Sequence, residues 1–319
     1  MGVDAETTVA DVGEFGLIAE VVPAELSERV LIGPGDDSAL VRVGDAPVLV
    51  ATDVLVENRH FRRDWVEAYD VGRRAAAANL ADIAAMGGTT TALTVGFAAP
   101  GDLPERWAVD LARGIADEAA LVGAEVVGGD VTAAEQVVVS VTVVGTCERA
   151  VRRDGARPGE VVALRGRIGW AAAGLAVLGR GFRSPRVVVD AYRRPEPPYD
   201  AGPQAARAGA TAMIDVSDGL LADLGHVAGA SGVTIDLDSA AFEIADPLRD
   251  VAAATNTDPL QFVLAGGDDH PLAATFAADD VPDGWTVVGR VGERRSAETV
   301  SVTVDGAPWE GSGGHQHYR

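Results

Sequence analysis

A Gly-Gly-Asp motif occurs once in each half of this 319-residue sequence, as Gly128-Gly129-Asp130 and as Gly266-Gly267-Asp268. The first follows the β-branched run at 124–127, and the second follows the apolar run at 262–265. Glycine at such a position indicates a tight turn, where a carboxylate is offered to a ligand by a rigid scaffold. One such turn in each half predicts two related α+β units.

The best candidate for a boundary between these units is the turn Arg157-Pro158-Gly159. A chain of 319 residues exceeds one small core, and domains of about 150 residues are the usual size. We predict an N-terminal α+β domain at residues 1–150 and a C-terminal α+β domain at residues 151–319.

Composition narrows the class of protein. Hydrophobic residues make up 47% and charged residues 23%, as in ordinary globular proteins. The net charge of -22 argues against nucleic acid or an anionic membrane as the main partner. All 26 basic residues are arginine, and this excludes the P-loop lysine, Schiff-base chemistry and kinase sites that need a strand lysine.

The single cysteine, Cys147, excludes a disulfide framework and a cysteine-based zinc site. No apolar run approaches the ~20 residues of a membrane span, and no secretory h-region follows a charged start. We therefore expect a cytoplasmic protein without a membrane partner.

Apolar periodicity, glycine and proline predict the order of the elements. Helices are expected at 13–23, 70–86, 104–121, 169–178 and 219–230, and strands at 47–52, 90–98, 124–127, 137–146, 161–165, 210–216, 233–237, 285–291 and 300–304. The proline-rich segment 194–203 is expected to be a long loop.

Acidic residues recur where strands end or glycine turns begin. The stretch Gly33-Pro34-Gly35-Asp36-Asp37-Ser38-Ala39 could form a cation site, but by itself it is more typical of a surface turn. Asp82 is unusual because it lies in mid-helix among apolar neighbours, where a buried carboxylate needs a partner. The candidate ligands are Asp36, Asp37, Thr52, Asp53, Asp82, Asp130, Asp215 and Asp218.

So many carboxylates indicate several Mg²⁺ ions rather than one. Mg²⁺ usually takes one or two carboxylates and leaves its other positions to water and phosphate. Since the chain has no lysine, metal would supply much of the charge neutralisation that phosphoryl transfer needs.

Three further residues are candidates for contact with a phosphorylated ligand. Ser217 ends a strand and opens a helix, so its hydroxyl and the first N–H groups of the helix can receive a phosphate. The alternative is that Ser217 or Asp218 only caps that helix. Arg153 and His60 can reach a ligand, or can be a surface arginine and a solvent-facing loop histidine.

The ordered motifs resemble the thiamine-monophosphate kinase family. They include Gly13-Glu14-Phe15, the Asp36-Asp37 stretch, Thr52-Asp53, Asn79-Leu80-Ala81-Asp82, Gly128-Gly129-Asp130 and Asp215-Val216-Ser217-Asp218-Gly219. The family is grouped with aminoimidazole ribonucleotide synthetase and selenophosphate synthetase. The resemblance implies a two-domain α+β fold and a homodimer that pairs strands of its N-terminal domains. It also implies that the N-terminal domain binds ATP and that the protein uses ATP to phosphorylate thiamine monophosphate to thiamine diphosphate.

The resemblance also implies residue roles, with Mg²⁺ and ATP as cofactor and co-substrate. No residue is expected to act covalently, and Asp53, Asp130 and Asp215 are expected to position the reactants. The implied metal ligands are Asp37, Thr52, Asp53, Asp82, Asp130, Asp215 and Asp218. The implied ATP contacts are Gly129, Asp130, Arg153 and Ser217, and the implied substrate contacts are His60, Asp268 and His315.

The sequence departs from the family pattern at positions that the resemblance places near the bound substrates. The family has Gly-Gly-Glu-Asp where this chain has Gly266-Gly267-Asp268-Asp269, and His315 replaces a C-terminal aromatic residue. Val122 replaces a tyrosine near the adenine, and Ala51 replaces a serine.

The expected reaction is in-line attack by a phosphate oxygen on the γ-phosphorus of ATP. The phosphate is already a dianion near neutral pH, so it needs no general base. The alternatives are another ATP-dependent member of the superfamily, or a non-catalytic Mg-nucleotide-binding protein. Selenophosphate synthetase is disfavoured because the only cysteine, Cys147, is far from the N-terminus.

Overall fold

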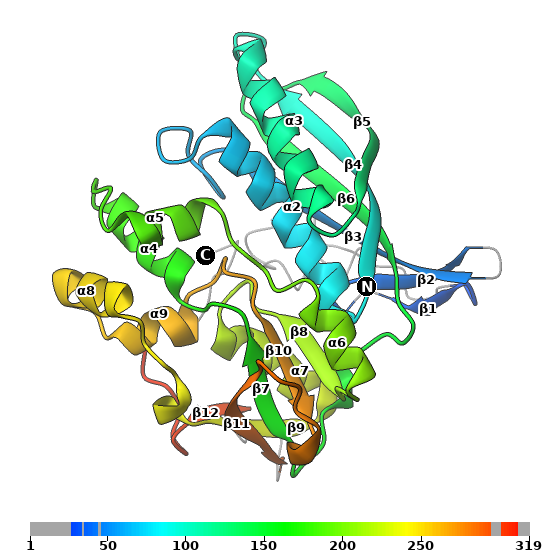
Figure 1. Ribbon diagram of the computed structural model, residues 1–319, viewed down its shortest axis with the longest axis vertical. Helices are drawn as coiled ribbons and strands as arrows, with labels where there is room; N and C mark the ends of the chain where they lie inside the picture. The colour runs from blue at the N-terminus through cyan, green and yellow to red at the C-terminus, as the bar shows by residue number, and fades with distance from the viewer. Residues whose placement is uncertain (1–26, 34, 44–45, 295–300, 312–319) are drawn as a thin grey trace, which may run out of the picture.

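The computed structural model describes residues 27–33, 35–43, 46–294 and 301–311. The helix expected at 13–23 and the substrate contact His315 lie outside the described residues. The described chain forms two 6-stranded mixed sheets, one in each half of the sequence, with helices packed on them (Figure 1). The predicted α+β class is confirmed.

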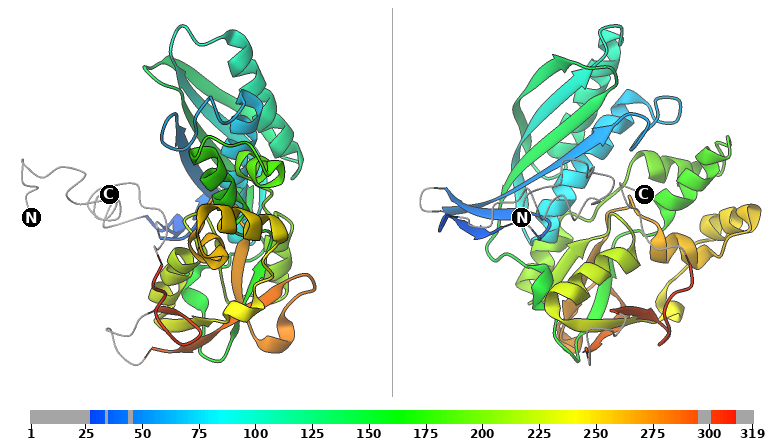
Figure 2. Two further views of the ribbon diagram at one scale, coloured as in Figure 1. Left: turned by 90° about the vertical axis from the view of Figure 1, so that its left-hand side faces the viewer. Right: turned by 180° about the vertical axis from the view of Figure 1, so that it is seen from behind.

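The first sheet has the order β1-β2-β3-β6-β4-β5. Its strands are β1 (Val30–Ile32), β2 (Ala39–Val43), β3 (Ala46–Val56), β4 (Thr89–Ala99), β5 (Glu125–Ala133) and β6 (Val138–Thr146). Helices α2 (Ala68–Ala85) and α3 (Glu105–Ala120) cover one face of this sheet. The right-hand view of Figure 2 shows the opposite face of the sheet. β4 and β5 pair in parallel, with α3 as the crossover between them.

Helices α2 and α3 approach each other closely because each has a glycine at the contact. A Cβ on Gly72 would lie 2.1 Å from the carbonyl oxygen of Leu111, and one on Gly114 would lie 2.0 Å from that of Tyr69. Helix α2 ends at Met86, and Gly87 then takes a left-handed conformation with φ of +74°. This arrangement fixes α2, which carries several candidate site residues, against the sheet.

The second sheet has the order β12-β9-β11-β7-β10-β8. Its strands are β7 (Val161–Arg165), β8 (Ala212–Asp215), β9 (Val233–Leu237), β10 (Leu272–Phe276), β11 (Thr286–Glu293) and β12 (Val302–Val304). The helices of this half are α4 (Trp170–Gly179), α5 (Arg186–Arg193), α6 (Ala201–Arg207), α7 (Leu220–Ser231), α8 (Asp246–Thr255) and α9 (Pro259–Ala265). Short 3₁₀ helices lie at Arg153–Gly155, Ser239–Ala241 and Ala278–Asp280.

The halves meet at the C-terminal part of α2. Ala84 and Ala85 share a buried cluster with Met213 of β8 and Ala205 of α6. A Cβ on Gly202 of α6 would lie 1.9 Å from the carbonyl oxygen of Ala84, so this contact also requires glycine. Side chains on α2 are therefore presented directly to β8.

The structure differs from the sequence prediction where two of the acidic motifs lie and in several elements that were not predicted, among them β1, β2, α5 and α8, and α6 begins inside the segment 194–203 that was expected to be a loop. Asp53 lies within β3 rather than at its end, because β3 continues to Val56 in register with β6. Gly128-Gly129-Asp130 is part of β5, paired along β4, and not a turn. The apolar run at 262–265, for which no element was predicted, is the last part of helix α9. The division at residues 150 and 151 remains a prediction.

Among the described residues, each helix falls short of the length and apolar character needed to cross a membrane.

Candidate active site

Three carboxylates from distant parts of the sequence converge between the two sheets. Asp37 comes from the segment before β2, Asp82 from α2 and Asp215 from the end of β8. One ligand atom from each lies within 4.8 Å of the others. The sequence prediction that these residues form one cluster is consistent with this geometry.

The energetics of the cluster favour a bound cation. Burial, together with the neighbouring charge of Asp215, raises the pKa of Asp37 to about 8 against the opposing effect of Arg153. The pKa of Asp82 is raised well above its usual value by burial and by the charges of Asp53, Asp215 and Asp37. Oδ2 of Asp37 is buried without a hydrogen-bond partner. Carboxylate oxygens held this close together are suited to Mg²⁺.

Arg153 lies inside the cluster rather than on the surface. Its Nη2 donates to Oδ1 of Asp37 at 2.8 Å, and its backbone N–H donates to Oδ1 of Asp36 at 2.7 Å. Asp36 thus ties the N-terminal segment to the start of the second half, while Asp37 faces the other acids. This separates the roles of the two adjacent aspartates.

Asp53 is held beside Asp82 by a side chain of α2. Oδ1 of Asn79 accepts a hydrogen bond from the backbone N–H of Asp53 at 3.0 Å. Nδ2 of Asn79 donates to the carbonyl of Ala75 at 2.9 Å. Thr52 instead points to the opposite face of the sheet, since consecutive strand residues alternate. Its hydroxyl donates to the carbonyl of Val141 at 2.9 Å.

Gly129 and Asp130 lie on the edge strand of the first sheet, away from the cluster. Gly129 pairs with Val95, Val95 with Val141, and Val141 with Asp53. Three strand spacings correspond to about 14 Å. Asp130 is exposed and lies on the face of the sheet that α2 and α3 leave uncovered.

Ser217 and Asp218 form the turn between β8 and α7. Oδ2 of Asp223 accepts the backbone N–H groups of Asp218 and Gly219 at 3.1 and 3.0 Å. One interpretation of the sequence let the first N–H groups of this helix receive a phosphate, but the N–H of Gly219 is bound by a buried carboxylate instead. Asp223, which the sequence analysis did not single out, is therefore the residue that fixes this turn.

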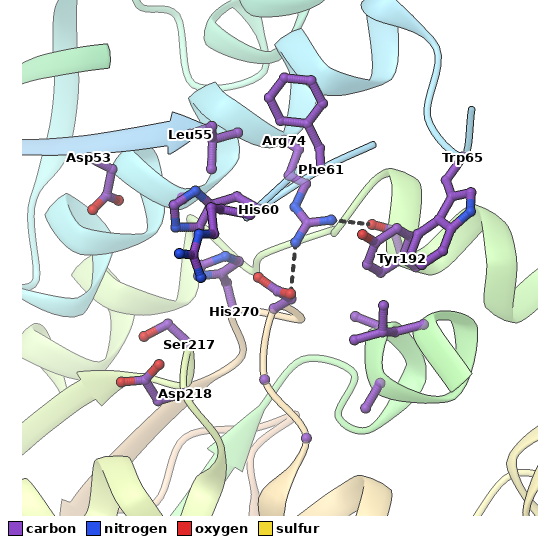
Figure 3. A pocket seen from close by; sticks show the side chains of 18 of the residues that line it. Asp53, Leu55, His60, Phe61, Trp65, Arg74, Tyr192, Ser217, Asp218 and His270 are labelled. Carbon is purple, nitrogen blue, oxygen red and sulfur yellow. Dashed lines mark hydrogen bonds and ion pairs between the residues drawn. The ribbon is translucent and has the colours of Figure 1, made fainter. Parts of the chain in front are cut away.

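A cavity of about 870 Å³ opens beside the acidic cluster. Asp53, Asp82, Asp215, Ser217 and Asp218 line one part of it. Figure 3 shows Asp53, Ser217 and Asp218 on one side, His60 and His270 in the middle, and Arg74, Trp65 and Tyr192 on the other side. The cavity therefore has an acidic end and an end with aromatic and cationic groups.

The histidines between these ends have defined orientations. Nδ1 of His60 accepts the backbone N–H of Val56 at 2.9 Å, so in the neutral ring Nε2 carries the proton. Nδ1 of His270 lies 2.9 Å from Oδ2 of Asp215. Burial lowers the pKa of His270, but the hydrogen bond and charge of Asp215 outweigh burial and raise it overall.

Sequence reasoning missed Arg74 and His270. His270 directly follows Gly266-Gly267-Asp268-Asp269, so its position beside a recognised motif was a usable signal. Arg74 lies in the predicted helix eight positions before Asp82, where an arginine among alanines usually reads as solvent-facing. The predicted substrate contact Asp268 lines the same cavity and forms an ion pair with Arg74 at 2.7 Å.

The fold and site define the class of AIR synthase related proteins. The chain matches the family model of the N-terminal domain of these proteins over residues 35–147 and that of the C-terminal domain over residues 157–301. It is 47% identical to a thiamine-monophosphate kinase of Mycobacterium tuberculosis over 315 residues, covering 98% of this chain and 93% of that protein. It is 37% identical to one of Corynebacterium glutamicum over 308 residues, covering 92% and 91%.

A solved structure described as AaThiL complexed with AMPPCP and TMP superposes on this chain with a TM-score of 0.89. The two are 31% identical, and the match covers 98% of this chain and 100% of that chain. The chain therefore belongs to the thiamine-monophosphate kinase family.

Proposed function

We propose that this protein transfers the γ-phosphoryl group of ATP to thiamine monophosphate and so produces thiamine diphosphate. The observation that carries the proposal is the convergence of Asp37, Asp82 and Asp215 within 4.8 Å at one end of the cavity. The solved relative described as a complex with AMPPCP and TMP supports both reactants. The cytoplasm as the place of the reaction is part of the same proposal.

The acidic cluster would hold several Mg²⁺ ions through Asp37, Asp53, Asp82, Asp215 and Asp218. When bound, these ions neutralise the charge of the transferring phosphoryl group and of the leaving diphosphate. Arg153 holds Asp37 at 2.8 Å, and Asn79 holds the backbone of Asp53 at 3.0 Å, so the ligands are fixed before the reactants bind.

The chain's own residues orient the acceptor for in-line attack. Nε2 of His60 faces the cavity as a donor for the acceptor phosphate, because its Nδ1 is bound to Val56. Ser217 donates its hydroxyl to the nucleotide from the turn that Asp223 fixes. A phosphate oxygen of the acceptor then bonds to the γ-phosphorus as the bond to the ADP oxygen breaks, and no side chain removes a proton.

We further propose a homodimer that pairs strands of its N-terminal domains, so that the uncovered face of the first sheet lies against a second copy. This face carries Thr52, Val54 and Asp130, and no helix of the described residues covers it. In this arrangement Gly129 and Asp130, three strands away from Asp53 along the sheet, would approach ATP from the side of the second copy.

The decisive experiment incubates the protein with ATP, Mg²⁺ and thiamine monophosphate and measures thiamine diphosphate by chromatography. Asp53→Asn should lower turnover at least about 100-fold with the fold intact. Free thiamine is the control acceptor, and it should fail because it lacks an anionic nucleophile. ATP binding without product would favour a non-catalytic nucleotide-binding protein, and phosphorylation of free thiamine would refute the mechanism.

A further inference from the structure

Arg74 places a buried cation on the wall of the cavity, opposite the acidic cluster. Its side chain is 4% exposed, yet it lines the cavity. Nη2 lies 2.7 Å from Oδ2 of Asp268, and Nη1 donates to the backbone carbonyl of Tyr192 at 3.3 Å. The guanidinium carbon lies 4.6 Å from the ring centre of Tyr192 (Figure 3). The contacts with Tyr192 of α5 and with Asp268 together orient the guanidinium.

Asp268 is fixed from two directions. It takes a left-handed conformation with φ of 68°, and its backbone N–H donates to the carbonyl of Ser217 at 2.9 Å. A Cβ on Gly267 would lie 2.0 Å from the same carbonyl oxygen, so the turn packs directly on Ser217. The side chain is bound by Arg74, but 44% of its surface stays open. Asp268 therefore presents a held carboxylate to the cavity.

We propose that Arg74 is a positioning residue that sets the affinity of the site for its acceptor through Asp268. This inference rests on the proposed function. The acceptor carries its phosphate at one end and an aminopyrimidine with N–H donors at the other. A carboxylate opposite the acidic cluster accepts these N–H groups, while the phosphate lies toward His60 and the bound metal.

The need for Arg74 follows from the charges around the cavity. Asp268 shares the cavity with Asp53, Asp82 and Asp215, and repulsion from these carboxylates would turn its side chain toward solvent. The aspartate side chain is also one methylene shorter than the glutamate of the family pattern, so it reaches less far by itself. The ion pair with a buried guanidinium holds the carboxylate in place.

The test compares four variants of the full chain. Arg74→Met removes the cation with little change in volume, Arg74→Lys keeps it, and Asp268→Asn removes the partner without altering α2. Arg73→Met is the matched control, because Arg73 is the neighbouring arginine on the same helix but pairs with Glu118 of α3 and does not line the cavity. Steady-state kinetics give separate KM values for both substrates. Tryptophan fluorescence gives the Kd of thiamine monophosphate independently of turnover.

Arg74→Met and Asp268→Asn should each raise the acceptor KM and Kd about 10- to 30-fold and leave the KM for ATP within about twofold. Arg74→Lys should have an acceptor Kd between those of wild type and Arg74→Met. The double variant Arg74→Met/Asp268→Asn should bind the acceptor no more weakly than the single variant with the higher Kd. Arg73→Met should lower Tm without changing the acceptor Kd. An unchanged acceptor Kd in Arg74→Met, an equal rise in both KM values, or fully additive losses of acceptor affinity in the double variant would overturn the inference.

If Arg74→Met does not fold, the acceptor Kd values of Arg74→Lys and Asp268→Asn test the inference. A wild-type chain that binds the acceptor but forms no thiamine diphosphate would refute the proposed function, while the Kd values still test Arg74.

Discussion

Arg153 donates to Oδ1 of Asp37 over 2.8 Å, while Oδ2 of the same carboxylate is buried with no hydrogen-bond partner. One side of Asp37 is thus neutralised by an arginine, and the other side faces Asp82 and Asp215 within 4.8 Å. Buried like charges at this distance make the metal-free fold electrostatically unfavourable. The first two predictions follow from this imbalance.

Without metal, the protein should lose stability as pH rises. The folded pKa of Asp37 is about 8 and its usual value is 3.8, so between these values the folded state holds a proton that the unfolded state has lost. Stability then falls with rising pH across this window. Thermal unfolding in EDTA should show Tm falling from pH 5 to pH 9, and saturating Mg²⁺ should flatten the slope. An identical slope with and without Mg²⁺ would contradict the metal assignment.

Asp82→Asn should stabilise the metal-free protein and inactivate the enzyme. At pH 9 the unfolded Asp82 is ionised, and folding forces this carboxyl to take up a proton or to stay charged in a buried site beside Asp53, Asp215 and Asp37. Asparagine avoids this cost, and the expected gain in Tm is about 2–6 °C in EDTA. Turnover should fall at least about 100-fold, because a ligand is lost. Differential scanning calorimetry and the thiamine diphosphate assay measure both effects.

The control for that variant is Asp70→Asn on the same helix. Asp70 is also buried, and burial raises its pKa as well, but it pairs with Arg194 at 2.7 Å, so the substitution also breaks an ion pair. Its Tm should fall and its Mg²⁺ affinity should not change. A lower Tm for both variants would show that repulsion does not dominate the cluster.

Asp269 should contribute a separate pH dependence. Its Oδ1 accepts the N–H of Ala171 at the start of α4 at 2.9 Å, its Oδ2 is buried without a partner, and burial raises its pKa to about 7. The folded state therefore favours the protonated form between about 4 and 7, and stability falls as pH rises through this range. Asn cannot ionise, so the Tm of Asp269→Asn relative to wild type should increase between pH 5 and pH 8. A difference that is constant with pH would exclude this role.

The sequence predicted the helix that carries Asp82 and the strand that carries Asp53, because alanine-rich and β-branched runs are local signals. It also predicted that distant aspartates belong together, and Asp37, Asp82 and Asp215 are close in the structure. It did not reveal the ion pair of Arg74 with Asp268, which joins α2 to a turn of the second half. Such a contact depends on how the two sheets are placed and leaves no local pattern.

Strand limits were the other weak point, for a physical reason. Glycine and aspartate favour turns, so Gly128-Gly129-Asp130 was expected to end a strand. In the fold, parallel pairing with β4 continues through all three residues, and Gly129 is required because β4 passes too close for a side chain. Tertiary pairing overrides the turn propensity here.

This packing role gives a prediction that separates Gly129 from its neighbour. A Cβ on Gly129 would lie 2.0 Å from the carbonyl oxygen of Val95, whereas one on Gly128 would meet nothing within 4 Å. Gly129→Ala should therefore push β5 away from β4 and cost about 1–3 kcal/mol, which lowers Tm by about 2–8 °C. Gly128→Ala, with the same chemical change one residue earlier, should stay within about 1 °C of wild type. Calorimetry of both variants in the absence of nucleotide measures packing alone. Because Gly129 is also an expected ATP contact, equal Tm values with a loss of ATP affinity only in Gly129→Ala would assign this glycine to the nucleotide and not to the sheet.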